Sequence, residues 1–278
     1  MEQDSLDARV RARLAGLHDA EARVAQVVFD QGAGLVHLSV SDVAGQAGTS
    51  ASTVVRACRR LGFGGYQELK IAAARQAPGE AEPEDEPDPV ARVLAATVRA
   101  AREALGGLGS TLSRTGLRES AEALGRASRV LVAGTGLSGA TATDAAYRLR
   151  ALGLPVDLPP DPLTAHLAAG LLPGSSVCLA ISHSGATRST VDTARRARAA
   201  GARVVAITSY ARSPLTELST WALVGGGQDL VFGMEAVASR LAHLTIVDTL
   251  SMLVLERGGR RARRAVSASA EVTASHSY

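Results

Sequence analysis

Residues 176–200 read SVCLAISHSGATRSTVDTARRARAA, and this stretch decides the fold class. The apolar run from Ser176 to Ile181 is typical of a buried strand, and Thr187 to Ala200 is typical of a helix. The turn between them is small, rich in hydroxyls and contains Gly185. A buried strand followed by a tight turn and a helix predicts one repeat of a parallel sheet with crossover helices.

The same turn predicts an anion site. The first backbone N–H groups of a helix have no partners within the helix and lie at the positive end of its dipole. Ser182, Ser184 and Thr187 add hydroxyl donors, and Gly185 lets the backbone approach a ligand closely. We therefore expect this turn to hold a phosphate.

The strand–helix pattern repeats on both sides of this stretch. Apolar strands are predicted at residues 129–133, 156–158, 176–181, 203–208 and 221–224, and helices at 90–105, 117–124, 138–152, 161–171, 187–200 and 235–255. This alternation predicts a doubly wound parallel sheet, whose ligands bind at the carboxyl ends of the strands near the point where strand order reverses. The turn GTGLSG at 134–139 also falls at such an end.

That second turn has a competing interpretation. Gly134, Gly136 and Gly139 form a G-x-G-x-x-G pattern, which by itself suggests a dinucleotide site. However, the acidic residue about 20 positions later, Asp157, lies within a weak strand flanked by prolines rather than in the usual ribose-binding place. The hydroxyls of the turn suit a sugar phosphate at least as well, so we expect a sugar phosphate and no cofactor.

The amino-terminal module is predicted to be all-helical and to contain a helix-turn-helix. Residues 38–62 read LSVSDVAGQAGTSASTVVRACRRLG. Ser39 or Ser41 can cap a first short helix, Gly48 allows a tight turn, and Ser50 can cap a second helix. Asp19 is the expected cap of a preceding helix. A helical hairpin with a solvated basic face remains the alternative.

The second helix carries a local basic excess that favours DNA binding. Small side chains in its first turn can approach base edges, and its bases can meet phosphates. The candidate DNA contacts are Ser50, Ser52, Thr53, Arg56, Arg59, Arg60 and Lys70.

Composition divides the chain into four parts. Residues 78–89 are acidic and rich in proline, which predicts an extended linker between a module at 1–77 and one at 90–257. Residues 258–278 are rich in arginine, serine and alanine and are expected to be a disordered tail, with a non-specific nucleic-acid contact as the alternative. The charged amino terminus, the two isolated cysteines and the absence of a run of about 20 apolar residues indicate a cytoplasmic protein with no membrane or metal partner.

The run from residue 38 to 70, including SASTVVR at 50–56 and LGFGGYQELK at 61–70, resembles the amino-terminal domain of the RpiR/MurR family of bacterial transcriptional regulators. A sugar isomerase (SIS) domain follows in that family, and the second half of this chain is similar to one. The resemblance implies an all-helical helix-turn-helix domain joined to an α/β SIS domain. It also implies that Gly134, Gly136 and Ser138 line the sugar, that Ser182, Ser184 and Thr187 hold the phosphate, and that Glu235 contacts sugar hydroxyls.

The sequence favours a regulator over an enzyme. Isomerisation of a sugar phosphate needs a general base near the reacting carbons. The candidates are His183, Glu235, His166 and His243, and they form no convincing catalytic set. We expect His183 to act as a donor within the phosphate loop. The alternatives are an active phosphosugar isomerase or lyase with a helical appendage, and a sensor that acts only through protein partners. The expected partners are operator duplex, a phosphosugar and a second copy, as a homodimer or homotetramer that uses the apolar last helix.

Overall fold

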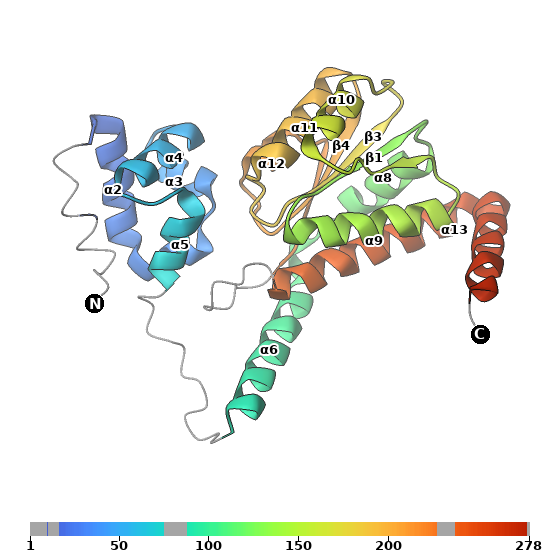
Figure 1. Ribbon diagram of the computed structural model, residues 1–278, viewed down its shortest axis with the longest axis horizontal. Helices are drawn as coiled ribbons and strands as arrows, with labels where there is room; N and C mark the ends of the chain where they lie inside the picture. The colour runs from blue at the N-terminus through green and yellow to red at the C-terminus, as the bar shows by residue number, and fades with distance from the viewer. Residues whose placement is uncertain (1–9, 11–16, 75–87, 227–236, 277–278) are drawn as a thin grey trace. The chain divides into compact units, whose positions relative to one another are not determined.

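The computed structural model describes residues 10, 17–74, 88–226 and 237–276 (Figure 1). The chain forms two compact units, residues 1–102 with 228–238 and residues 103–227 with 239–278. Most of the predicted acidic linker and Glu235 fall outside the described residues.

The amino-terminal unit is a small helical bundle. Its elements are α2 (Asp19–Gln31), the 3-10 helix η2 (Gly32–His37), α3 (Val40–Gln46), α4 (Ala51–Arg60) and α5 (Tyr66–Ala74). Helices α2, α3 and α4 pack against one another, and α5 packs against η2. Val24, Val43 and Val54, one from each of the first three helices, are fully buried. Apolar residues at helical spacing therefore build the core that the sequence predicts.

Helices α3 and α4 form the predicted helix-turn-helix. Ser39 caps α3 by accepting a hydrogen bond from the amide of Asp42 at 3.1 Å, and Ser50 caps α4 by accepting one from the amide of Thr53 at 3.3 Å. Gly48 takes a φ of 60° in the turn. Arg23 of α2 donates to the carbonyl of Ala47 at 2.9 Å, so the turn is fastened to the bundle.

One predicted cap is wrong. Helix α2 is capped by His18 and not by Asp19, which is the first helical residue. His18 has an extended backbone, and its amide donates to the carboxylate of Glu21 at 3.2 Å. This reciprocal capping box sets the start of the helix one residue earlier than the aspartate alone suggests.

The carboxy-terminal unit is a three-layer α/β domain. The elements from Pro89 onward are α6 (Pro89–Gly106), α7 (Leu108–Thr111), α8 (Arg114–Gly125), β1 (Val130–Ala133), α9 (Leu137–Ala151), β2 (Val156–Asp157), α10 (Pro162–Gly170), β3 (Val177–Ile181), α11 (Arg188–Ala199), β4 (Arg203–Thr208), α12 (Pro214–Leu218), β5 (Trp221–Val224) and α13 (Val237–Ser275). The strands form one parallel sheet in the order β2-β1-β3-β4-β5. Helices α10, α11 and α12 cover one face, and α8, α9 and α13 cover the other (Figure 1). The predicted doubly wound sheet is confirmed.

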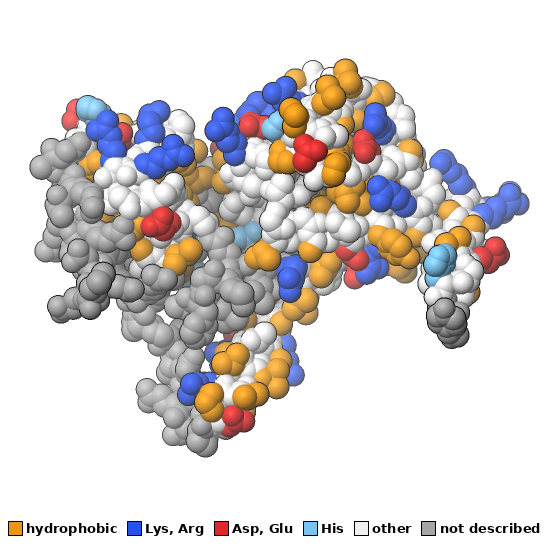
Figure 2. Space-filling view, viewed as in Figure 1, with side chains coloured by type: hydrophobic (Ala, Val, Ile, Leu, Met, Phe, Trp, Pro, Cys, Tyr) orange, Lys and Arg blue, Asp and Glu red, His pale blue; other side chains and the backbone are white. Residues whose placement is uncertain are grey.

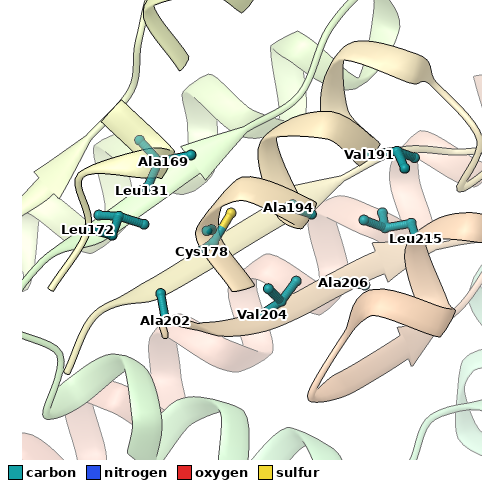
Figure 3. Close-up of a cluster of buried hydrophobic side chains, with 12 residues drawn as sticks. Leu131, Ala169, Leu172, Cys178, Val191, Ala194, Ala202, Val204, Ala206 and Leu215 are labelled. Atoms are coloured by element: carbon teal, nitrogen blue, oxygen red, sulfur yellow. The ribbon is translucent and has the colours of Figure 1, made fainter. Parts of the chain in front are cut away.

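Small side chains allow the helices to pack closely on the sheet. In the cluster of Figure 3, Leu131, Cys178 and Val204 of the strands meet Ala194 of α11 and Leu215 of α12. Every one of these five is essentially inaccessible to solvent. Alanine at the contact positions of α10 and α11 lets the core be dense although aromatic residues are only 3% of the sequence.

Both cysteines are buried in this chain, one in each unit. Cys58 lies on the inner side of α4, and Cys178 lies in β3. Burial raises the pKa of each thiol from 9.0 to about 12. Neither thiol is therefore ionised or reactive in the folded protein at neutral pH.

The carboxy-terminal segment differs from the predicted disordered tail. Helix α13 continues to Ser275, with non-helical angles at Gly259 (φ 54°, ψ −136°). Alanine, arginine and glutamate after the kink are good helix formers, and the glycine supplies the break. The apolar first part of α13 is long and hydrophobic enough to cross a membrane, but half of that window is buried inside the domain, as in a core helix.

Candidate functional site

The strand order places the candidate site between β1 and β3. Strand β1 connects to β2 on one side, and β3 begins the other half of the sheet on the opposite side of β1. This is the point where strand order reverses, and parallel sheets of this type bind ligands at the carboxyl edge there. The loops that leave β1 and β3, residues 134–136 and 182–187, both lie at this edge.

The loop after β3 has the backbone of an anion cradle. Thr187 is the N-cap of α11, and its side chain makes no capping hydrogen bond, so the first amides of α11 are left for another acceptor. The amide of Ala186 donates to Ser184 Oγ at 3.2 Å. Ser182 is fully buried, with its Oγ 3.0 Å from Thr187 Oγ1. Ser182 therefore shapes the loop, while Ser184 and Thr187 remain partly exposed at its surface.

Gly185 is required in this loop for two reasons. Its φ of 61° is one that side chains with a Cβ rarely adopt. A Cβ at this position would also lie 2.5 Å from Ser213 Cβ and closer still to Ser213 Oγ. The carbonyl of Gly185 accepts a hydrogen bond from the amide of Leu215 at 2.9 Å, which ties the loop to α12.

The loop after β1 meets the phosphate loop directly. The amide of His183 donates to Ser138 Oγ at 3.3 Å, and Thr135 Oγ1 lies 3.2 Å from Ser189 Oγ at the start of α11. A Cβ on Gly134 would stand 2.8 Å from the carbonyl of Ser138, so only glycine fits there. Gly136 has a φ of 60° and is the N-cap of α9. The structure thus brings together the two predicted loops.

Three polar side chains form a buried cluster behind the phosphate loop. His183 Nδ1 lies 2.9 Å from Ser209 Oγ, which in turn lies 3.1 Å from His243 Nε2. Ser209 Oγ also lies 3.3 Å from the carbonyl of Gly225. The hydroxyl has a single proton to donate to these three groups, so at least one imidazole N–H must donate to it. Both histidines are less than a tenth exposed, and the cluster therefore fixes the His183 ring.

Ser209 was missed by sequence reasoning, and His243 was considered only as a candidate general base. Ser209 directly follows β4, so the rule that ligands meet the carboxyl ends of strands could have identified it. His243 is buried at 2% exposure within α13. His166 contacts the backbone of α11, with Nε2 3.1 Å from the carbonyl of Ser189. Glu235, the predicted sugar ligand, is outside the described residues.

One hollow lies beside these loops, and another lies at the opposite edge of the sheet. A cavity of about 60 Å³ borders Gly134, Thr135 and Thr190, beside the β1 loop. A larger one of about 350 Å³ is lined by Arg126, Leu154 and their neighbours at the amino ends of the strands. The larger hollow is therefore far from the loops that carry the predicted chemistry, and size alone does not identify the site.

The exposed face of α4 carries part of the predicted DNA contacts. Ser52, Arg56 and Arg59 are exposed and follow one another at steps of four and three residues, which places them on one side of the helix. Basic side chains gather on this face in Figure 2. Ser50 serves as the cap of α4, and Arg60 is paired with Glu21 at 3.4 Å.

Two predicted DNA contacts need correction. Thr53 is 7% exposed, and its Oγ1 accepts a hydrogen bond from Arg56 at 3.0 Å. Lys70 is also 7% exposed, on the inner side of α5 beside Leu69. Both residues fall on the buried side of their helices, where they pack within the bundle.

A helix-turn-helix unit followed by a parallel α/β domain is the organisation of a class of transcriptional regulators. Residues 5–78 match the family model described as the helix-turn-helix domain of the rpiR family, and residues 123–252 match the SIS domain. The regulator HexR of Pseudomonas aeruginosa is 30% identical over 259 residues, which cover 90% of this chain and 89% of HexR. The chain therefore belongs to the rpiR family of helix-turn-helix transcriptional regulators.

Two solved structures share its fold. The NanR protein of Vibrio vulnificus, complexed with ManNAc-6P, has a TM-score of 0.81 and 25% identity, with 98% of this chain and 99% of NanR covered. The sugar isomerase domain of an RpiR transcription factor from Sphaerobacter thermophilus has a TM-score of 0.56 and 19% identity, and covers 66% of this chain and 98% of that domain.

Proposed function

We propose that this regulator binds operator DNA through α4 and responds to a phosphorylated sugar held between the loops after β1 and β3. The observation that carries the proposal is the direct link between those loops, the hydrogen bond from the His183 amide to Ser138 Oγ at 3.3 Å. The link joins a hydroxyl of one loop to an anion cradle on the other at the carboxyl edge of the sheet. The related NanR structure, which contains ManNAc-6P, supports a ligand of this class.

The two ends of the ligand meet different groups in this proposal. The phosphate lies against the first amides of α11 and the hydroxyls of Ser184 and Thr187. Sugar hydroxyls meet Ser138 and the backbone at Gly134 and Gly136, and the space beside Gly136 is open, because a Cβ there would meet no atom within 4 Å. Ser182 holds the loop in shape. Glu235 would contact sugar hydroxyls from the segment that precedes α13.

On DNA, α4 is proposed to enter the major groove. Ser52 and Arg56 would face base edges, because they stand on the exposed side of the second helix of the motif. Arg59 and Arg60 would meet phosphates. The capping role of Ser50 orients the helix and leaves its first turn free to approach the duplex.

The chain is proposed to bind its sugar phosphate without converting it. His183, the histidine inside the phosphate loop, has its ring engaged with Ser209 and its carbonyl bound by the Thr208 hydroxyl at 2.9 Å. An imidazole held this way suits a fixed donor better than a mobile base. NMR of candidate phosphosugars with stoichiometric protein tests this point, and any turnover would favour the isomerase or lyase alternative.

We also propose a cytoplasmic homodimer or homotetramer that reads a palindromic operator, because paired half-sites add contacts that one helix-turn-helix lacks. Of the predicted apolar last helix, Val247 and Leu250 are buried within the domain and offer no surface for this contact. Leu163, Leu167 and Leu171 of the α10 region are 65–79% exposed and are better placed for it. Light scattering at micromolar concentration tests the oligomer.

The central experiment measures operator affinity with and without each member of a phosphosugar panel. Thermal shift first finds the ligand, because a ligand at ~100 times its dissociation constant adds about 2.7 kcal/mol of stability. Operator affinity should then change with that ligand, typically by about 1–3 kcal/mol of coupling. A chain that binds the sugar but never responds on DNA would exclude the proposed coupling.

A further inference from the structure

The helix that ends the chain forms a separate arm beyond its kink. Gly259 breaks α13, and residues 260–276 continue as the segment that we call the C-terminal arm (Figure 1). Its inner side holds it to the domain. Ala262 is only 4% exposed, and the Cβ of Ala265 packs against the backbone at Gly153. The arm therefore has a fixed orientation about its own axis relative to the domain it follows.

The outer side of the arm is strongly basic. Arg260, Arg261, Arg263 and Arg264 are all exposed, and Glu271 is the only acidic residue between Arg260 and His276. Blue side chains crowd the start of the arm in Figure 2. Within the described ranges, none of these four guanidinium groups is paired with a carboxylate. Other arginines of the same domain, such as Arg129 with Asp157 at 2.7 Å, do have such partners.

Helical spacing aligns three of the four arginines. Arg260, Arg263 and Arg264 share one face with Ser267 and, further along, with Glu271, and Arg263 and Arg264 follow Arg260 by three and four residues. Arg263 and Arg264 therefore lie about 4.5 and 6 Å beyond Arg260 along the axis, next to each other on the following turn. The result is a cluster of three guanidinium groups without a carboxylate partner on an ordered helix, and such bidentate donors recognise phosphate groups.

We propose that the C-terminal arm binds the phosphodiester backbone of duplex DNA, as a second contact that does not depend on base sequence. The inference rests on the proposed DNA-binding function of the chain. An anionic membrane surface is the less favoured partner, because the arm offers only Val266 and Val272 as exposed large apolar side chains. The arm gives the protein general affinity for DNA, while α4 selects the operator.

The test removes the three arginine charges without breaking the helix. The variant R260Q/R263Q/R264Q keeps good helix formers. The matched control, R114Q/R118Q/R196Q, removes the same charge from exposed arginines elsewhere in the same unit. Full-length proteins are titrated with operator duplex and with scrambled duplex across a salt series, and circular dichroism checks folding.

Three phosphate contacts should appear as a reduced salt dependence. The slope of log affinity against log salt concentration should become shallower by about 2.7 for both duplexes. The ratio of wild-type affinity to arm-variant affinity should therefore shrink about 40-fold between about 50 and 200 mM salt. The control should keep the wild-type slope. Equal slopes for the arm variant and the wild type would overturn the proposal, as would an equal loss in both variants. If the arm variant loses binding to anionic vesicles while its binding to both duplexes matches that of the wild type, the proposal is overturned in favour of a membrane partner.

A direct contact can be tested with one added thiol. Ser267→Cys places the only exposed cysteine on the arm, because Cys58 and Cys178 are buried. A photoactivatable group at this position should crosslink to duplex DNA, and Ser110→Cys, exposed near α7, should not. If the wild type binds operator but the arm probe never crosslinks, the arm proposal fails alone. If the wild type shows no preference for any duplex, the proposed function fails.

Discussion

The main-chain amide of His183 donates to the hydroxyl of Ser138 at 3.3 Å, across 45 residues of sequence. This bond joins the loop of β3 to the first turn of α9. A ligand that draws either loop closer must therefore affect the other. The predictions below concern this joined pair of loops, the cluster behind it, the DNA-reading helix and the buried thiols.

Ser184→Asp should abolish phosphosugar binding. The carboxylate would stand where the phosphate belongs, and the only lysine of the chain, Lys70, lies in the other unit. Ser184→Ala should be milder, at about 1.5–3 kcal/mol for one hydrogen bond to a charged group. Isothermal titration measures both, and operator affinity without ligand should stay at the wild-type value. An unimpaired response to ligand in Ser184→Asp would place the effector elsewhere.

Gly185→Ala should destabilise the carboxy-terminal unit. The residue has a φ of 61°, and a Cβ would collide with the side chain of Ser213. We expect a loss of at least about 1–3 kcal/mol, because backbone strain and overpacking add. The matched control is Gly170→Ala, in a helix with no atom within 4 Å of the added Cβ. Urea titration compares the two, and similar stabilities would contradict the collision.

Ser209→Ala should weaken both folding and ligand binding. The hydroxyl is shared by His183 and His243, at 2.9 and 3.1 Å, and its removal leaves buried ring nitrogens without that partner. The expected loss of stability is about 1–3 kcal/mol. Thermal unfolding and titration with the phosphosugar provide the measurements. Exposed Ser110→Ala is the control, and the idea is wrong if both variants behave alike.

Arg56→Ala should reduce the preference for operator by about 1–3 kcal/mol, because a base contact is removed from the exposed face of α4. Affinity for scrambled duplex should fall much less. Arg114→Ala, an exposed arginine of the other unit, should leave both affinities unchanged. Fluorescence anisotropy at constant salt makes the comparison. A uniform loss on both duplexes would reassign Arg56 to a phosphate contact.

Stability should decline at alkaline pH through the two thiols. The folded chain holds each thiol proton up to a pKa of about 12, above the value of 9.0 expected after unfolding. The stabilising contribution is therefore complete below pH about 9 and is lost as the pH rises towards about 12, by roughly 1.4 kcal/mol per pH unit and per thiol. The stability advantage of wild type over Cys178→Ala should shrink accordingly in urea titrations. A constant advantage across that range contradicts the prediction.

Local patterns predicted the elements of this site better than its contacts. The strands, the two loops and the caps at Ser39 and Ser50 follow from short-range periodicity and turn chemistry, and the structure has them. The bond between Ser209 and His243 joins residues 34 apart, and no local pattern specifies such a pair.

The sequence predicted where the helices lie better than it predicted which side of each helix is buried. A polar residue such as Thr53 or Lys70 gives no local sign of being buried, because the packing of neighbouring helices decides which side of α4 or α5 turns inward. The tail was misjudged for a related reason. Its charge suggested disorder, but its helix propensity and the anchoring of Ala262 favour an ordered helix.

Each unit contains one buried thiol, and the rate at which that thiol is alkylated reports how often its unit opens. A buried thiol can be alkylated only after its surroundings open. The alkylation rate of Cys58 therefore reports the opening of the helix-turn-helix domain, and that of Cys178 reports the opening of the SIS domain. Both rates can be followed in one tube by peptide mass, with no added probe. Operator DNA should slow the alkylation of Cys58, and a phosphosugar should slow the alkylation of Cys178. A ligand that slows alkylation in the domain to which it does not bind would reveal the coupling between the two domains.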